Sequence, residues 1–134
     1  MPEKNVEVVE RMTGAFLAGD VTTALEVLDD EVVWHGTIGG LDEGRIARGH
    51  REVIEGFSEN LKEWESHVLE ARQFIEAGHE RVVVFWHEEG RGRSSGVEVT
   101  TDTAVIYTVR GGHIVEAQGY MDRSAALKAA GLEE

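Results

Sequence analysis

Six histidines are the side chains in this sequence best suited to acid–base or metal chemistry. They are scattered along the chain, at His35, His50, His67, His79, His87 and His113. No two of them have the His-x-His or His-x-x-x-His spacing that directs two imidazoles to one metal ion, so we expect no metal site. The sequence contains no cysteine, which excludes disulfides, thiolate zinc sites and cysteine nucleophiles. Acid–base chemistry by histidine and carboxylate groups remains.

Two acidic residues in the second half of the chain are placed to orient a histidine. Glu88 and Asp102 lie in segments rich in β-branched residues, where a carboxylate either pairs with an imidazole or points into solvent. The run from Gly90 to Gly96 resembles a phosphate-binding loop, but it joins two expected strands and no helix follows it. We interpret this run as a hairpin tip.

The charge balance excludes several classes of partner. The chain has 134 residues and a formal net charge of −13, which fits one acidic domain spanning residues 1–134. Nothing in such a chain would neutralise phosphates, so we expect no nucleic-acid partner and no anionic membrane surface. No apolar run approaches the length of about 18 residues that a membrane-spanning helix needs. The N-terminal residues lack the apolar core of a secretory signal, so we expect a cytoplasmic protein.

Hydrophobic periodicity predicts helices first and strands afterwards. Apolar residues recur at helical spacing over residues 4–18, a short helix follows the capping residue Asp20, and a third begins near Gly49. Four runs rich in β-branched and aromatic residues follow, at 67–77, 81–89, 97–109 and 113–121. A short helix is expected over residues 124–130. Three helices before a four-strand antiparallel meander indicate an α+β fold, with a curved sheet over the helices and a pocket between the layers.

Alternation along the third expected strand identifies its inward face. Seven residues of one parity, apolar except for two threonines, form this face: Val97, Val99, Thr101, Thr103, Val105, Tyr107 and Val109. Tyr107 is placed either to donate a hydrogen bond from this face or only to pack there. The run 81–89 is apolar on both faces, so its inward face stays open. Such a run is typical of a sheet covered on both sides, which favours a dimer.

Five short motifs stand in a characteristic order along the chain. They are Ala18-Gly19-Asp20, Leu28 to Trp34, Arg48-Gly49-His50, the hairpin from Val109 to Val115, and Tyr120 to Arg123 leading into Ala129 to Leu132. In this order they resemble the SnoaL-like branch of the nuclear transport factor 2-like superfamily, which includes ketosteroid isomerases and polyketide cyclases. The resemblance implies a cone-shaped α+β barrel with a cavity open at one end. It also implies acid–base chemistry without metal or organic cofactor, and pairing of two subunits through the outer sheet face.

The resemblance places two candidate catalytic residues. The stretch from Asp29 to His35 aligns with the family segment that ends in the catalytic base of ketosteroid isomerase-like enzymes, so the base position falls on His35. Imidazole serves well as a general base near neutral pH. Asp122 stands about where polyketide cyclases of this fold carry an acid–base aspartate, although the residues that follow also make it a helix N-cap.

Other family positions are not matched. The tyrosine and the protonated aspartate of the isomerase oxyanion hole fall on Met12 and between Thr103 and Val105, so steroid isomerisation of the known kind is not expected. No Arg-x-Asp sequence occurs, so the limonene epoxide hydrolase mechanism is not expected either.

We therefore predict a largely apolar pocket for a small apolar organic ligand. Its expected lining is Met12, Phe16, Trp34, Phe57, Leu61, Trp86, Thr101, Thr103, Val105 and Tyr107. If the protein is an enzyme, the expected reaction is a cofactor-independent isomerisation, cyclisation or dehydration, with His35 as base and Thr103, Tyr107 or Asp122 assisting. The alternative is a non-catalytic binding or dimeric assembly module, which the missing oxyanion pair favours.

Overall fold

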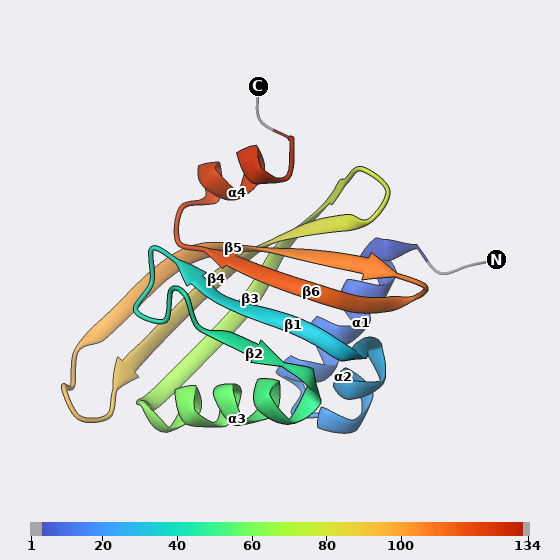
Figure 1. The fold of residues 1–134 in the computed structure, drawn as a ribbon. Coiled ribbons are helices and arrows are strands. Elements are labelled where there is room, and N and C mark those ends of the chain that lie inside the picture. The colour runs from blue at the N-terminus through green and yellow to red at the C-terminus, as the bar shows by residue number, and fades with distance from the viewer. Residues whose placement is uncertain (1–3, 133–134) are drawn as a thin grey trace.

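Ten helices and strands follow one another along residues 4–132, the part of the chain that this computed structural model describes. They are α1 (Asn5–Leu17), α2 (Val21–Val27), β1 (Leu28–Ile38), β2 (Ile46–Arg48), α3 (Gly49–Lys62), β3 (Trp64–Ala77), β4 (Arg81–Gly92), β5 (Glu98–Arg110), β6 (His113–Tyr120) and α4 (Arg123–Ala129). Figure 1 shows one curved sheet, with α2 and α3 below it, α1 behind it and α4 above it. This arrangement is the predicted α+β class.

The helices are those the sequence predicted, but they do not form one block. β1 and β2 separate α2 from α3, so the prediction of three consecutive N-terminal helices is wrong in chain order. Local signals explain where helices begin: the Asp20 carboxylate accepts a hydrogen bond from the Thr23 N–H at 3.2 Å and caps α2. Gly49 has a φ of 78°, a left-handed conformation that glycine adopts without strain. This conformation lets the chain turn sharply from β2 into α3.

The sheet of the described residues has six strands, in the order β2-β1-β6-β5-β4-β3. The predicted four-strand antiparallel sheet is therefore wrong in strand number and in direction, because β1 pairs parallel with β6. The remaining neighbours are antiparallel. β1 contains a short apolar piece, Val32 to His35, between acidic residues and glycines, which strands disfavour. It is a strand because it pairs with β6, far along the chain (Leu28 with Ile114, Ile38 with Tyr120), and not because of its local composition.

Each face of the sheet is buried against different helices. We call the face toward α1, α2 and α3 the inner face; its core includes Val82, Val84, Trp86, Tyr107, Val109 and Ile114. We call the other face the outer face; its core is Ala77, Val83, Ala104, Ile106, Ala126 and Ala130, the last two packing from α4 and its C-terminal end. These two cores show which residues of the run 81–89 face inward, a question that the sequence left open. β4 is apolar on both faces because α4 covers the outer one, so its pattern needs no second subunit.

Candidate functional site

Aromatic rings from α1, α3, β1 and β5 meet on the inner face. The ring centroids of Phe16 and Phe57 lie 4.9 Å apart, and Trp34 lies 5.1 Å from Phe57 and 5.8 Å from Tyr107. Tyr107 is buried, and burial raises the pKa of its hydroxyl although the Trp86 side chain hydrogen bonds to it. Tyr107 thus stays a neutral phenol within this aromatic cluster.

Burial along the inner face falls from one end to the other. Residues at the end that we call the narrow end, such as Val82 and Ile114, are fully buried. At the opposite or wide end, where α3 leads into β3 and β4 ends, Leu61 keeps 54% of its surface exposed. Val105, Thr103 and Thr101 on β5 are all half-buried. The inner face is therefore closed at the narrow end and open at the wide end.

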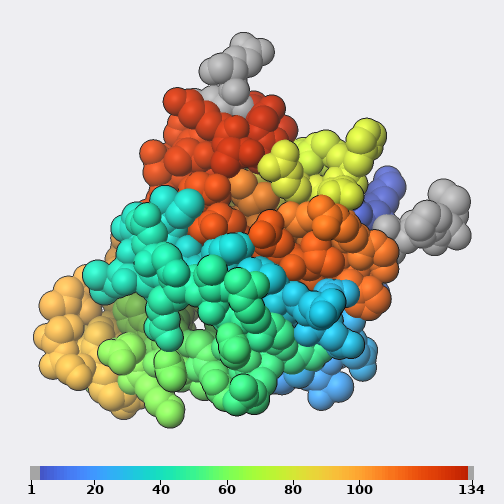
Figure 2. Space-filling model, viewed as in Figure 1, coloured from blue at the N-terminus to red at the C-terminus, as the bar shows by residue number. Residues whose placement is uncertain are grey.

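The structure brings most of the predicted pocket residues together. Seven belong to the inner core or pack against it: Met12, Phe16, Trp34, Phe57, Trp86, Val105 and Tyr107. Thr101 and Thr103 pair with Glu88 and Trp86 of β4, which places both threonines on the inner face nearer the wide end. Figure 2 shows the surface hollowed between α3 and the glycine-rich segment that links β1 to β2.

An ionisable pair lies at the wide end; sequence reasoning offered Glu88 as a partner for a histidine but did not identify that histidine, which is His67. His67 Nε2 lies 2.9 Å from a carboxylate oxygen of Glu88, with His67 7% and Glu88 26% exposed at their side chains. Trp64 stacks on His67, with ring centroids 4.6 Å apart and the planes 5° from parallel. The indole N–H of Trp64 is buried without a hydrogen-bond partner among the described residues, which costs about 1–3 kcal/mol. What identifies the pair is the register of β3 against β4, which sets residues 67 and 88 on one face and which neither strand determines alone.

Gly90 makes room for this stack. A methyl group at its Cβ position would come within 2.5 Å of the six-membered ring of Trp64. Trp64 therefore lies directly over the backbone of β4, where only a glycine allows so close an approach. The sequence interpretation had included Gly90 in a hairpin tip, but β4 continues to Gly92.

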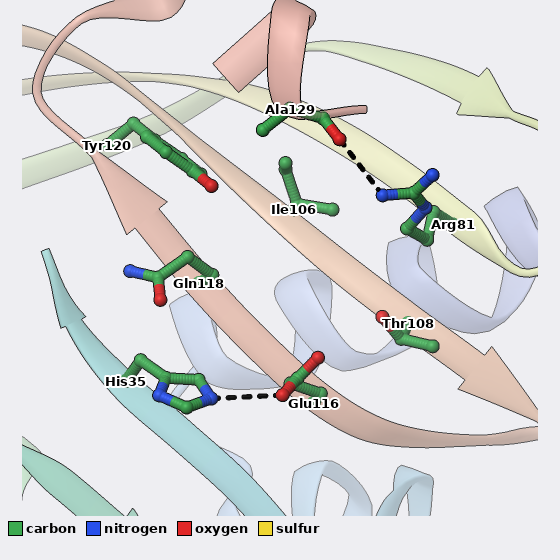
Figure 3. A pocket seen from close by; sticks show the side chains of 8 residues that line it. All are labelled: His35, Arg81, Ile106, Thr108, Glu116, Gln118, Tyr120 and Ala129. Carbon is green, nitrogen blue, oxygen red and sulfur yellow. Dashed lines mark hydrogen bonds and ion pairs between the residues drawn. The ribbon is translucent and has the colours of Figure 1, made fainter. Parts of the chain in front are cut away.

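His35 lies on the outer face. Trp34 takes the inner position on β1, and neighbouring residues of a strand point to opposite faces. His35 Nε2 lies 3.0 Å from a carboxylate oxygen of Glu116 on β6. The two side chains border a cavity of about 340 Å³ that Figure 3 shows in close view. Its lining is His35, Arg81, Ile106, Thr108, Glu116, Gln118, Tyr120 and Ala129.

Asp122 caps α4. Its carboxylate accepts a hydrogen bond from the Ser124 N–H at 2.9 Å, and the residue is exposed. The capping role that the sequence indicated is therefore confirmed, and an acid–base role remains a prediction. The structure does not bring His35 or Asp122 to the inner face.

A second histidine on the outer face is held by two carboxylates. His87 Nδ1 lies 2.6 Å from Asp102 and Nε2 lies 3.1 Å from Glu89. The hydrogen bond to Asp102 is the main cause that raises the pKa of His87, and the same bond lowers the pKa of Asp102. Arg123 lies 3.5 Å from Asp102. Both carboxylates that the sequence placed near histidines thus have one, Asp102 here and Glu88 on the inner face.

Two searches among the described residues bear on other site types. No group of three or more histidine, aspartate or glutamate side chains is arranged to hold a metal ion there. No helix in that part of the chain is long and apolar enough to cross a membrane.

Comparison with known proteins defines the class. The model of the SnoaL-like domain matches residues 9–117. An NTF2-like protein from Burkholderia thailandensis E264 superposes with a TM-score of 0.81 at 17% identity, covering 96% of this chain and 98% of that one. TerC, solved as a co-crystal with polyporic acid, gives a TM-score of 0.73 at 26% identity, with 95% and 98% covered. A search of curated proteins by sequence gave no match.

A further NTF2-like protein, from Burkholderia pseudomallei K96243 and described as of unknown function, gives a TM-score of 0.75 at 22% identity, with 95% and 97% covered. The architecture is that of the NTF2-like fold. The chain belongs to the SnoaL-like domain family, as the motifs in its sequence predicted.

Proposed function

We propose that this protein binds a small, largely apolar organic molecule between its helices and the inner face of the sheet. The observation that carries the proposal is the gradient of burial along that face. Valines seal the narrow end, whereas Phe57 and Val105 are only half-buried and Leu61 is 54% exposed. Half-exposed apolar side chains inside a concave layer are typical of small-molecule sites. TerC, which was co-crystallised with an organic acid, gives independent support.

Nile red, a neutral dye whose emission rises in apolar surroundings, tests the proposal. We expect its fluorescence to rise on addition of the protein and to fall when a small apolar competitor such as naphthalene is added. The Val105→Phe variant fills the half-buried stretch of β5 and should weaken dye binding by about tenfold, or about 1.4 kcal/mol.

Val68→Phe is the matched control, because Val68 is 57% exposed and neighbours the inward-facing His67 and Leu69 on β3. Its dye binding should equal that of the unchanged protein. Equal dye affinity in the Val105→Phe variant, with its melting temperature unchanged, would contradict an inner-face site.

Non-catalytic binding is the second candidate function. The observation that favours it is that His35 lies on the outer face and Asp122 caps a helix. Under this candidate, His35→Gln leaves dye binding unchanged. Weaker dye binding in that variant would place His35 at the ligand and support its predicted role as general base.

Pairing of two copies through the outer face, which the family resemblance implies, remains a proposal. The part of that face that α4 leaves open is the surface in question. Sedimentation equilibrium should give twice the chain mass of 14.8 kDa, and a mass of one chain would contradict pairing.

A further inference from the structure

The His67–Glu88 dyad has no role in the sequence resemblance, yet it lies where the inner face opens. His67 is paired with Gly90, and Glu88 with Leu69, so the register gives all four residues the same face. Leu69 packs against the inner core, which identifies that face as the inner one. The dyad is thus a polar pair at the rim of an apolar layer.

The dyad leaves one imidazole nitrogen available. A carboxylate can only accept, so the 2.9 Å contact requires Nε2 of His67 to donate its proton to Glu88. In the neutral imidazole, Nδ1 is then an acceptor with its lone pair free. Nδ1 of His67 has no hydrogen-bond partner among the described residues. The ring also stacks against the indole of Trp64.

Trp64 adds a donor beside this acceptor. Its ring is almost parallel to that of His67, and its N–H is buried without a partner in the part of the chain that the structure describes. The stack, with ring centroids 4.6 Å apart, places both side chains at the wide end of the inner face. A hydroxyl group can satisfy both, because its proton is donated to Nδ1 while its oxygen accepts from the indole N–H.

We propose that His67, Glu88 and Trp64 form the polar recognition point of the inner-face site, and that the ligand is a flat apolar molecule with a phenol or enol hydroxyl. This inference rests on the proposed function. The hydroxyl is bound in its neutral form, because a phenolate would face the Glu88 carboxylate in a chain of net charge −13. The apolar body of the ligand would lie toward Phe57 and Val105, deeper along the same face.

Displacement of Nile red by three related compounds tests this inference. Naphthol carries the hydroxyl, its methyl ether keeps the oxygen acceptor but has no donor, and naphthalene has neither. We expect naphthol to bind about tenfold more tightly than naphthalene, with the methyl ether in between.

Two variants locate the effect. His67→Phe keeps a ring against Trp64 but removes the acceptor, so naphthol should fall to the affinity of the methyl ether. Trp64→Phe keeps the stack but removes the donor, so the methyl ether should fall to the affinity of naphthalene. His79→Phe, at an exposed residue of the β3–β4 turn, is the control and should change none of the three affinities.

The outcomes separate this inference from the proposed function. If all three compounds displace the dye with equal affinity, or if the naphthol preference survives in His67→Phe, the recognition point is wrong while the apolar site stands. If none of them displaces the dye, the proposed function is wrong and this inference is overturned with it. The comparison requires that His67→Phe folds and binds the dye. We expect both, and its melting temperature checks the folding.

Discussion

The two faces of the sheet each hold a histidine hydrogen bonded to a carboxylate on a neighbouring strand, yet the two histidines are in different situations. On the outer face, His87 uses both ring nitrogens, one toward Asp102 and the other toward Glu89. On the inner face, His67 uses only one, toward Glu88. Two carboxylates engage both ring nitrogens of His87, whereas the single carboxylate at His67 leaves Nδ1 without a hydrogen-bond partner among the described residues. The second ring nitrogen of His67 is therefore the atom that the proposed recognition point uses, and His87 has no such nitrogen to spare.

The outer network also fastens α4 to the sheet. Arg123, at the start of α4, lies 3.5 Å from Asp102 and donates to the backbone carbonyl of Trp86 at 3.2 Å. Its guanidinium lies 4.6 Å from the ring centroid of Phe85. His87 is thus linked to α4 through Asp102, which it shares with Arg123.

The largest expected difference between the faces concerns their tyrosines. Tyr107 is buried at the centre of the inner face, so Tyr107→Ala should lower the free energy of unfolding by about 3–5 kcal/mol, as for other large buried aromatics. Tyr120, on the outer face, is only half-buried, so Tyr120→Ala should cost less. Urea unfolding of both variants measures the two costs, and equal values would break the comparison.

A smaller effect is expected from a single methyl group at Gly90. Gly90→Ala would push against Trp64, and such overpacking costs about 1–3 kcal/mol of unfolding free energy. The displaced indole should also weaken Nile red binding. Gly56→Ala is the control, because nothing lies within 4 Å of its Cβ position in α3, and it should stabilise the protein by about 0.5–1 kcal/mol. Thermal unfolding checks both, and stabilisation by Gly90→Ala would contradict the placement of Trp64.

The smallest expected effect is the pH dependence of stability that His87 and Asp102 on the outer face produce. The pKa of His87 is raised above 6.5, so its pairing contributes fully below that pH and is lost as pH rises through the raised pKa. The pKa of Asp102 is lowered below 3.8, so its contribution is present above that pH and is lost as pH falls through the lowered pKa. The melting temperatures of the unchanged protein and of the His87→Gln variant should therefore differ most between pH 3.8 and pH 6.5. The same measurement on His79→Gln should show no such window.

The parts of the fold with strong local signals were predictable from the sequence. The start of α3 near Gly49, the caps at Asp20 and Asp122 and the alternation of β5 depend on neighbours a few residues away, and the structure has them as expected. β1 was missed because its strand conformation depends on β6, far along the chain. A local pattern cannot report a partner at that distance.

The site was harder to predict for the same reason. Hydrophobic parity predicted the inner face of β5, but the family alignment put the base position on His35, and the structure gives that residue the outer face. In a strand, a displacement of one residue exchanges the two faces. Finding the His67–Glu88 dyad required the register between β3 and β4, which neither strand determines alone.

The parallel pairing of β1 with β6 has a consequence for how the chain reaches its folded state. Residues 28–38 cannot complete their hydrogen bonds until residues 113–120 have been synthesised, so the middle of the sheet closes late during translation. Contacts between such distant segments slow folding, and an unpaired strand edge in the meantime invites association with other chains. The formal net charge of −13, which makes copies of the chain repel one another, is then a protection for the unfinished chain as much as a property of the finished one.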